Sequence, residues 1–469
     1  MIDAEETRFI RNRDEEENAA TQIPEGERVE VPCIWVIEAF PPSLIENLKI
    51  GAERLGWDKQ NTFLNDDFIE AVQSMRESER GGGWLNLGFI TSPAQKTFPF
   101  AGRQAQLPNG IRSIHVTLAQ EMPSITMLCC CFMMDSDSTH LLEQPLQETF
   151  STQKEQVRGG ILYRGVEEQK QNAVETMRSY LHDICTRWVI EHFPGYFAAE
   201  GSEKSLPCCE LMLFDKAEEF YQRDTRKDLD YVDMLASRFG TSVWKSDDLE
   251  NLYLRLEERN TSATRRCALI GNKNLIFANA DLKMYGDEKM RQILGRLHDF
   301  DRTLVHWTLN LISTRLISEF ANLRDSYGML DVGSETVSSD ARRLDIDFNL
   351  VQRVALPFVY DIRRSVNNER LFEFGVYEFK TQFYGHKEDL LLFQNIRAKL
   401  LSDAQHLEET EKQIRAIAEH VARFVSAASN EHLAETNIVL QNRILWMTFV
   451  MLFLTAVTAI EPLKKLLSD

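Results

Sequence analysis

The sequence feature that most constrains this chain is an uncharged run of seventeen residues near its end, from Ile444 to Ile460. As a helix that rises about 1.5 Å per residue, the run covers roughly 26 Å, slightly less than the ~30 Å hydrocarbon core of a bilayer. Such a helix must be covered by lipid or by protein. We predict a single membrane span over 444–460 and a short tail over 461–469. The alternative is a hydrophobic helix or coiled-coil end that packs against the soluble part.

The residues that flank this run are those expected at membrane interfaces. Arg443 on one side and the Lys464 and Lys465 pair on the other can reach the two interfaces along their aliphatic stems. Trp446 lies where an interfacial aromatic residue is expected. The predicted anchor residues are Arg443, Trp446, Phe449, Leu452, Phe453, Lys464 and Lys465.

Charge and cysteine usage limit the remaining possibilities. The formal charge of −19 argues against bulk nucleic-acid binding, because no broad positive field is available to attract phosphates. The N-terminus is charged from its third residue and lacks the apolar segment of a secretory signal, so we expect most of the chain in the cytosol. The eight cysteines show no CxxC spacing and are expected to be reduced core residues. The sequence singles out no metal-binding or cofactor-binding residue and leaves any cofactor open.

The first 285 residues divide into a leader and a mixed head. Residues 1–29 are acidic and poor in large hydrophobic residues, which predicts a disordered leader. Residues 30–285 alternate short β-rich runs with helical patterns and predict a mixed α/β head domain. The expected strands are 29–37, 84–90, 111–119, 124–134, 208–214 and 267–277, and the expected helices are 43–56, 66–77 and 164–192. The interruption at Pro123 suggests that the strands 111–119 and 124–134 form a hairpin or are neighbouring strands, and Gly271 to Asn274 suggests a hairpin turn.

The rest of the chain is predicted to be helical. We expect a helical domain over 288–385 and a long stalk helix over 386–443, which enters the apolar run without a proline or glycine. Apolar residues recur at seven-residue intervals along the stalk and form a seam: Phe393, Leu400, Leu407, Ile414 and Val421. This stalk seam either joins copies of the chain in a homo-oligomer or packs against the preceding helix of the same chain. The predicted fold class is α+β, with a mixed α/β cytosolic head, a long-helix stalk and a single C-terminal membrane helix.

The junction from stalk to span, Asn437 to Thr448, resembles the CorA-type magnesium transporter superfamily in its divergent forms. The resemblance covers the last 80 residues. In that family five stalk helices converge on the membrane and the first membrane helix lines the pore, which implies a homo-oligomer. Glu461-Pro462-Leu463 stands where the family has Gly-Met-Asn, and a second span is not seen. The resemblance therefore implies a stalk-to-membrane architecture but assigns no ion-coordinating residue.

One short motif suggests catalysis. Asp135 and Asp137 lie in the string Asp-Ser-Asp-Ser-Thr, directly after an apolar run. This string resembles the first motif of haloacid-dehalogenase phosphatases, in which the first aspartate is the nucleophile and the second is the acid/base. The alternative is a turn or helix cap at the end of a strand, to which Asp and Ser are suited.

These observations favour a non-enzymatic sensor or effector that is anchored in a membrane. Its head would bind an unknown cytosolic ligand or protein partner, and its stalk would couple that event to the membrane helix in contact with lipid. A CorA-like effector of antiviral defence is one protein of this layout. The alternatives are a phosphatase-like hydrolase that uses Asp135 and Asp137, and a passive membrane scaffold.

Overall fold

The computed structural model describes most of the chain and divides it into two compact units. The described residues are 2–57, 68–77, 83–93, 103–158, 160–200, 206–217, 231–235, 241–257, 265–278, 300–331, 336–367, 372, 377–381 and 390–466. Unit 1 comprises residues 1–317 and 353–406, and unit 2 comprises residues 318–352 and 407–469. Each unit is described by itself.

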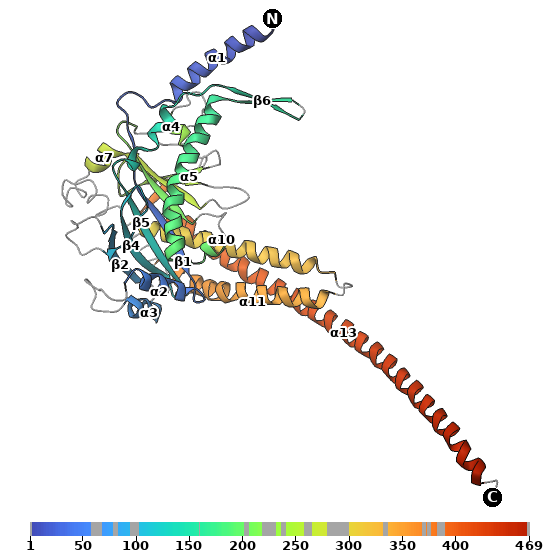
Figure 1. The fold of residues 1–469 in the computed structure, drawn as a ribbon. Helices are drawn as coiled ribbons and strands as arrows, with labels where there is room; N and C mark the ends of the chain where they lie inside the picture. Colours follow the sequence, from blue (N-terminus) through green and yellow to red (C-terminus); the bar gives the residue numbers. More distant parts are fainter. Residues whose placement is uncertain are drawn as a thin grey trace. The chain divides into compact units, whose positions relative to one another are not determined.

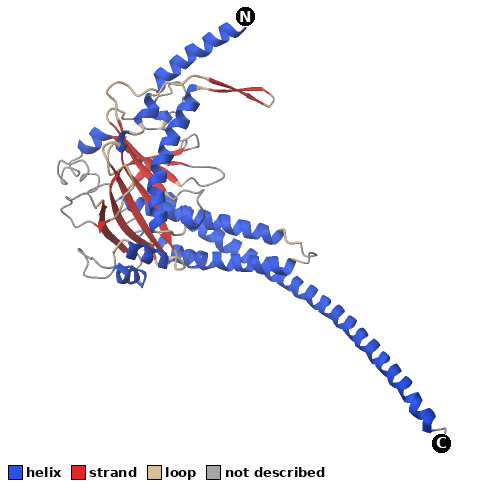
Figure 2. Ribbon diagram, in the orientation of Figure 1, coloured by secondary structure: helices blue, strands red, loops and turns tan. Residues whose placement is uncertain are grey.

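Unit 1 is built on one large mixed sheet (Figures 1 and 2). Among the described residues, eleven strands follow the order β13-β12-β9-β10-β11-β8-β1-β5-β4-β2-β3. Their bounds are β1 (Val29–Phe40), β2 (Gly83–Thr91), β3 (Arg103–Gln104), β4 (Ile111–Met122), β5 (Ile125–Met134), β8 (Cys208–Phe214), β9 (Thr241–Ser246), β10 (Leu252–Glu257), β11 (Arg266–Asn272), β12 (Phe379–Thr381) and β13 (Leu390–Leu391). Strands β8 and β11 are parallel, as are β2 and β3, and the other pairs are antiparallel.

The central strands form the core because their sequences are apolar on both faces. Every residue of β5 and of β8 is buried, which is consistent with their largely apolar, non-alternating sequences; the one charged residue of these two strands, Glu210 of β8, is hydrogen-bonded to Arg178. The eight cysteines are all free and buried, as predicted. The hairpin predicted at Pro123 is also confirmed, since Met122 pairs with Ile125 across the turn between β4 and β5.

Helices cover both faces of the sheet. The described α-helices of unit 1 that follow β1 are α2 (Ile45–Arg54), α3 (Phe68–Glu77), α4 (Glu143–Gln147), α5 (Val166–His192), α6 (Tyr231–Met234), α7 (Lys273–Ala278), the first part of α10 (Phe300–Gly328), the end of α11 (Val337–Asp361) and the start of α13 (Leu392–Leu466). On one face, Trp188 of α5 packs edge-on against Phe132 of β5, with ring centroids 5.9 Å apart. On the other face, Phe300 of α10 packs against Trp35 of β1 at 5.5 Å. Because Trp35 pairs with Cys131, the neighbour of Phe132, the two contacts lie on opposite faces. The fold is therefore α+β, as predicted.

Unit 2 is a packed set of three helical segments. They come from the end of α10, from the part of α11 (Val337–Asp361) up to Gln352, and from α13 (Leu392–Leu466) from Leu407 onward. The Tyr327 hydroxyl donates to Asp345 Oδ1 at 2.6 Å, and Phe320 packs on Phe348 with ring centroids 6.1 Å apart. Gln352 of α11 donates a hydrogen bond to Glu411 of α13. Helix α13 runs without a break over 75 residues, so the predicted stalk and apolar run form one helix.

The acidic leader forms a helix, so the prediction of disorder is wrong. Helix α1 (Ile2–Thr21) carries opposite charges four residues apart, and Arg13 Nε lies 2.6 Å from Glu17 Oε1. Such pairs support a helix despite a high net charge. Asp14 is buried and accepts hydrogen bonds from the backbone N–H and the hydroxyl of Thr152, at 2.8 and 2.6 Å.

The hairpin turn predicted at 271–274 is also wrong. Strand β11 ends at Asn272, and α7 begins at Lys273. Both edges of β11 are already paired, with β8 and with β10, so no place is left for a hairpin partner. Asn272 instead caps the new helix, because its Oδ1 accepts the N–H of Leu275 at 3.0 Å.

The two compact units do not coincide with the predicted domain boundaries at 285 and 386. Strands β12 and β13 belong to the region predicted as helical, yet Lys380 of β12 pairs with Lys245 of β9 in the main sheet. The first part of α13 therefore belongs to unit 1, and the stalk begins only one residue after a sheet strand.

Candidate functional site

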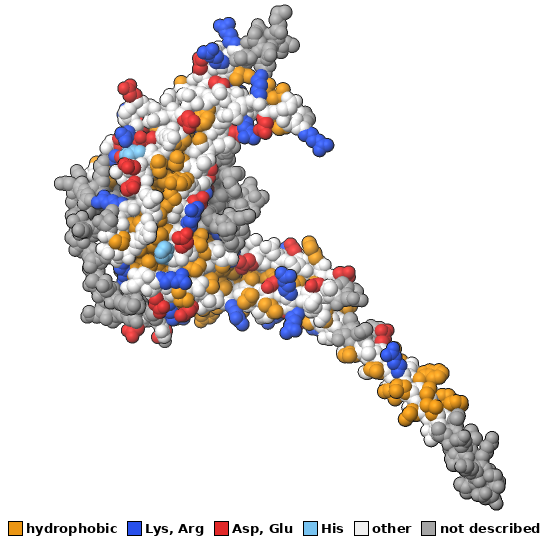
Figure 3. Space-filling model, in the orientation of Figure 1, with side chains coloured by type: hydrophobic (Ala, Val, Ile, Leu, Met, Phe, Trp, Pro, Cys, Tyr) orange, Lys and Arg blue, Asp and Glu red, His pale blue; other side chains and the backbone are white. Residues whose placement is uncertain are grey.

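An exposed apolar surface lies toward the end of α13. Residues Leu433–Thr455 form an apolar helical segment of 23 residues, and none of the residues in its most hydrophobic window is buried. Figure 3 shows hydrophobic side chains gathered on this part of the helix. The segment is long and apolar enough to cross a membrane by length and composition.

The predicted anchor residues are arranged along this exposed helix. The side chains of Arg443, Trp446, Phe449, Leu452 and Phe453 are all exposed, and each aromatic or aliphatic member is about two-thirds accessible. Lys464 and Lys465 belong to the same helix, but their side chains lie outside the described residues.

Two threonine hydroxyl groups in this segment form hydrogen bonds within the helix. Thr448 donates to the carbonyl oxygen of Ile444 at 2.8 Å, and Thr455 donates to that of Met451 at 2.7 Å. A polar group in the hydrocarbon region has no water available and must be bonded internally. These two threonines therefore fit a lipid environment.

The five residues of the stalk seam are buried within the chain. Phe393, Leu400, Leu407, Ile414 and Val421 are all buried within the chain, so this part of the seam packs against the chain's own residues. The sequence left open whether the seam joins copies of the chain or packs within one chain, and at these five positions the structure shows packing within one chain. Beyond Val421 the described residues of α13 are mostly exposed, including the large apolar residues Phe424 and Ile438.

The Asp135 and Asp137 motif forms a turn at the end of β5. Asp135 Oδ1 accepts the backbone N–H of Ser138 at 2.8 Å, and the Thr139 hydroxyl donates to the Asp135 carbonyl oxygen at 2.7 Å. Asp137 is exposed, and its Oδ1 accepts a bond from Ser136 at 3.4 Å. This geometry is that of the turn or cap alternative. In the described part of the chain, no three His, Cys, Asp or Glu side chains are placed to hold a metal ion.

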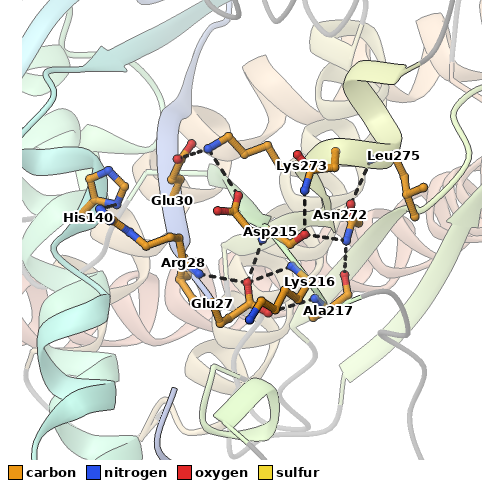
Figure 4. Close-up of polar contacts among 12 residues, drawn as sticks. Glu27, Arg28, Glu30, His140, Asp215, Lys216, Ala217, Asn272, Lys273 and Leu275 are labelled. Atoms are coloured by element: carbon orange, nitrogen blue, oxygen red, sulfur yellow. Dashed lines mark hydrogen bonds and ion pairs between the residues drawn. The ribbon is translucent and has the colours of Figure 1, made fainter. Parts of the chain in front are cut away.

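A polar cluster lies at the carboxyl ends of the parallel strands β8 and β11 (Figure 4). The Glu27 carboxylate accepts the backbone N–H groups of Asp215, Lys216 and Ala217 at 2.8, 3.0 and 3.0 Å. It also accepts the hydroxyl of Tyr231 at 2.7 Å. The segment before β1 is thereby held against the end of β8.

Lysine and asparagine side chains complete this cluster. Lys273 forms ion pairs with Glu30 and with Asp215, the latter at 3.4 Å. The Asn272 amide donates to the carbonyl oxygen of Ala217 at 3.0 Å. Ligands often bind at the carboxyl ends of parallel strands, but here the protein's own groups occupy these bonds. The cluster therefore works as an internal clamp.

A second charged cluster is buried between α5 and the sheet. Arg178 donates to Glu210 at 2.7 Å and to Glu257 at 2.8 Å, and His182 forms an ion pair with Glu210. Burial alone would raise the pKa of Glu210, but the charges of Arg178 and His182 outweigh it and lower that pKa to about 2. For His182, burial would lower the pKa, but Cys208 and Glu210 raise it to about 10. The pair is therefore ionised at neutral pH.

Glu38 is a buried acid for which burial outweighs the groups that stabilise its charged form. Its carboxylate accepts the N–H groups of Phe197, Ala198 and Ala39 at 2.8, 3.0 and 2.9 Å. Burial raises its pKa to about 7, although these hydrogen bonds favour the charged form. Glu38 therefore changes its charge near neutral pH inside unit 1. By contrast, burial raises the pKa of the Cys129 thiol well above its usual value, which makes that thiol unreactive.

Sequence reasoning missed both charged clusters, because their members come from distant segments. The signal available was weak: Asp215 and Asn272 are polar residues that directly end two buried apolar strands. Comparisons with protein-family models, curated proteins and solved structures find no match to this chain.

Proposed function

We propose that this chain is a membrane-anchored protein whose α/β unit lies in the cytosol and binds a ligand or partner, without catalysing a reaction. The observation that carries the proposal is the apolar segment of α13, of which the most hydrophobic window is wholly exposed. Exposed apolar patches of this size are rare on soluble proteins and mark contact with lipid or with another protein. The run 444–460 carries no charged residue on any side of the helix, which favours lipid over a partner that covers one face.

The energy of lipid contact is sufficient for an anchor. The run 444–460 contains nine Leu, Ile, Phe and Val residues. Each contributes about 0.3–0.6 kcal/mol near the centre of a bilayer, which gives roughly 3–5 kcal/mol in total. The span is short, so Arg443 and the later lysines would have to reach the interfaces, as their positions allow.

Continuity of α13 supports a role for the stalk as a coupling element. Leu392 begins the helix directly after Leu391 of β13, so a change in the sheet edge is transmitted along an unbroken helix. A ligand shifts this helix only if it binds two arrangements with different affinity. A CorA-like effector has the same order of parts along the chain: an α/β unit, packed helices, a long helix and an apolar end. We therefore propose a relationship to that family and a role in antiviral defence.

The proposal is tested by fractionating cells that express the full chain or a version ending at Gln441. After a carbonate wash, we expect the full chain in the membrane pellet and the shortened version in the supernatant. A full chain that is soluble after cell lysis would remove the membrane anchor and leave 444–460 to a protein partner.

A further inference from the structure

One arginine beside the buried charged cluster takes no part in its bonds. Arg255 lies in β10 and is only 7% exposed. Its Nε and Nη1 atoms are buried and form no hydrogen bond. In the part of the chain that the structure describes, no ion pair joins Arg255 to a carboxylate. A buried guanidinium group without an acceptor is costly, because water no longer solvates its charge.

The sheet places Arg255 next to the ion pairs that α5 makes. Ala268 of β11 pairs with Glu210 of β8 on one side and with Arg255 on the other, so all three side chains share one face of the sheet. Glu257, two residues after Arg255 in β10, lies on the same face and accepts a hydrogen bond from Arg178 of α5. Arg255 therefore lies under α5, in the same layer as the cluster.

The cluster does not neutralise Arg255. Its two carboxylates are already bonded, Glu210 to both Arg178 and His182 and Glu257 to Arg178. Three buried cations, Arg178, His182 and Arg255, thus face two buried carboxylates, which leaves an excess of one positive charge.

The acid outside this cluster that acts most strongly on Arg255 is Asp233 of α6. Burial and the charge of Arg178 lower the pKa of Arg255 to about 10, although Asp233 raises it. Asp233 is half-buried, forms no described ion pair with Arg255, and has another partner. Arg255 therefore remains charged at neutral pH, with its donors directed at none of the described acids.

We infer that Arg255 binds the carboxylate group of a small ligand. The planar guanidinium group presents N–H donors in a fork that matches the two oxygens of a carboxylate. A carboxylate carries one negative charge and cancels the excess of one positive charge, whereas a phosphate monoester carries nearly two. Because the donor atoms are buried, the site suits a small molecule rather than a protein surface. The inference rests on the proposed ligand-binding role of the α/β unit and gives that ligand a chemical class.

The first test is equilibrium dialysis of the full chain in detergent against radiolabelled acetate, at constant ionic strength with chloride as the competing anion. We expect saturable binding of one acetate per chain. Arg255→Met should weaken this binding by at least about tenfold, because it removes both the charge and the donors. Arg255→Lys keeps the charge but lacks the planar fork, so it should weaken binding less than Arg255→Met. Arg353→Met, at an exposed arginine of α11, is the matched control and should bind acetate like the wild type.

Three outcomes of the dialysis would overturn the proposal. They are a wild type without saturable acetate binding, equal affinities of the wild type and Arg255→Met, and a wild type that binds labelled phosphate but not acetate.

A second measurement separates binding from folding. Without acetate, Arg255→Met should melt at the wild-type temperature or above it, because it removes a buried charge that has no partner. Acetate should raise the melting temperature of the wild type and of Arg353→Met but not that of Arg255→Met. A lower melting temperature of Arg255→Met without acetate would show that the chain's own groups use this arginine, and would overturn the proposal. Failure of acetate binding leaves the membrane anchor standing, whereas a soluble chain that binds acetate refutes only the anchor.

Discussion

Replacing Leu452 by arginine should release most of the protein from the membrane. Leu452 lies at the middle of the run 444–460, with eight residues on either side, and is 66% exposed in the chain. An arginine at the centre of a membrane helix costs about 2.5–3.5 kcal/mol and also removes the leucine contribution of about 0.5 kcal/mol. The loss of roughly 3–4 kcal/mol nearly cancels the 3–5 kcal/mol that we assign to the whole run.

The assay is flotation of the full chain with liposomes, followed by a carbonate wash. We expect the wild type almost entirely in the lipid fraction and Leu452→Arg reduced to about half or less. The matched control is Phe424→Arg, an exposed position on the same helix that lies before the apolar segment Leu433–Thr455. Equal flotation of both variants would refute the reasoning. A lower melting temperature for Leu452→Arg in detergent would show that this leucine is packed in a protein core.

The remaining predictions concern the folded units. Glu210→Gln leaves a buried arginine without one of its two main partners and should lower the free energy of unfolding in urea by roughly 3–5 kcal/mol; the exposed Glu46→Gln should change it by less than about 1 kcal/mol. The Glu38 pKa of about 7 exceeds its unfolded value of 4.5, so its contribution to stability is complete below pH 4.5 and is lost as the pH rises through 7. Relative to Glu38→Gln, wild-type stability should therefore fall by about 1.4 kcal/mol per pH unit between pH 5 and 7, and parallel pH profiles would contradict this. Leu400→Ala should lower the free energy of thermal unfolding by about 2–5 kcal/mol, because the leucine is fully buried within the chain. Phe424→Ala should lower it little, because Phe424 is exposed in a single copy. Equal losses for the two variants would indicate that the seam packs between copies.

The sequence predicted the core of the fold because that core depends on local apolar patterning. Strand β8 has the predicted bounds of 208–214, and the predicted strand at 124–134 is β5 within one residue. The helix predicted at 164–192 is α5. In each case a continuous apolar run or a helical repeat is sufficient to specify the element.

Elements that depend on distant partners were not predicted. Helix α1 is stabilised by its ion pairs and by the contact of Asp14 with Thr152, which are 138 residues apart. The hairpin of β6 (Gln153–Val157) and β7 (Gly160–Arg164) and the strands β9 and β10 have mixed polar sequences, and their pairing depends on the neighbouring segment. The end of β11 at Asn272 follows from pairing on both of its edges, which a local turn pattern does not reveal.

In the candidate site, too, locally encoded features could be predicted from the sequence and those that depend on distant residues could not. The apolar run is visible in the sequence because hydrocarbon contact requires a local composition, and the structure adds that the described side chains of the run, up to Thr455, are exposed. The seam residues are also visible, but only the structure shows that the chain's own residues cover them. The pairing of Arg178 with Glu210 requires the sheet to place β8 beneath α5, and no local pattern contains that information.

The measurement that tests the membrane anchor most directly is the solvent accessibility of single nitroxide labels along α13 in liposomes. The eight native cysteines are buried and free, so introduced cysteines at exposed positions can be labelled selectively. We predict that a label at Leu452→Cys collides mainly with oxygen, which concentrates in lipid. We predict that a label at Phe424→Cys, before the apolar segment Leu433–Thr455, collides mainly with a water-soluble nickel complex. Equal access of the nickel complex to both labels would contradict the membrane anchor.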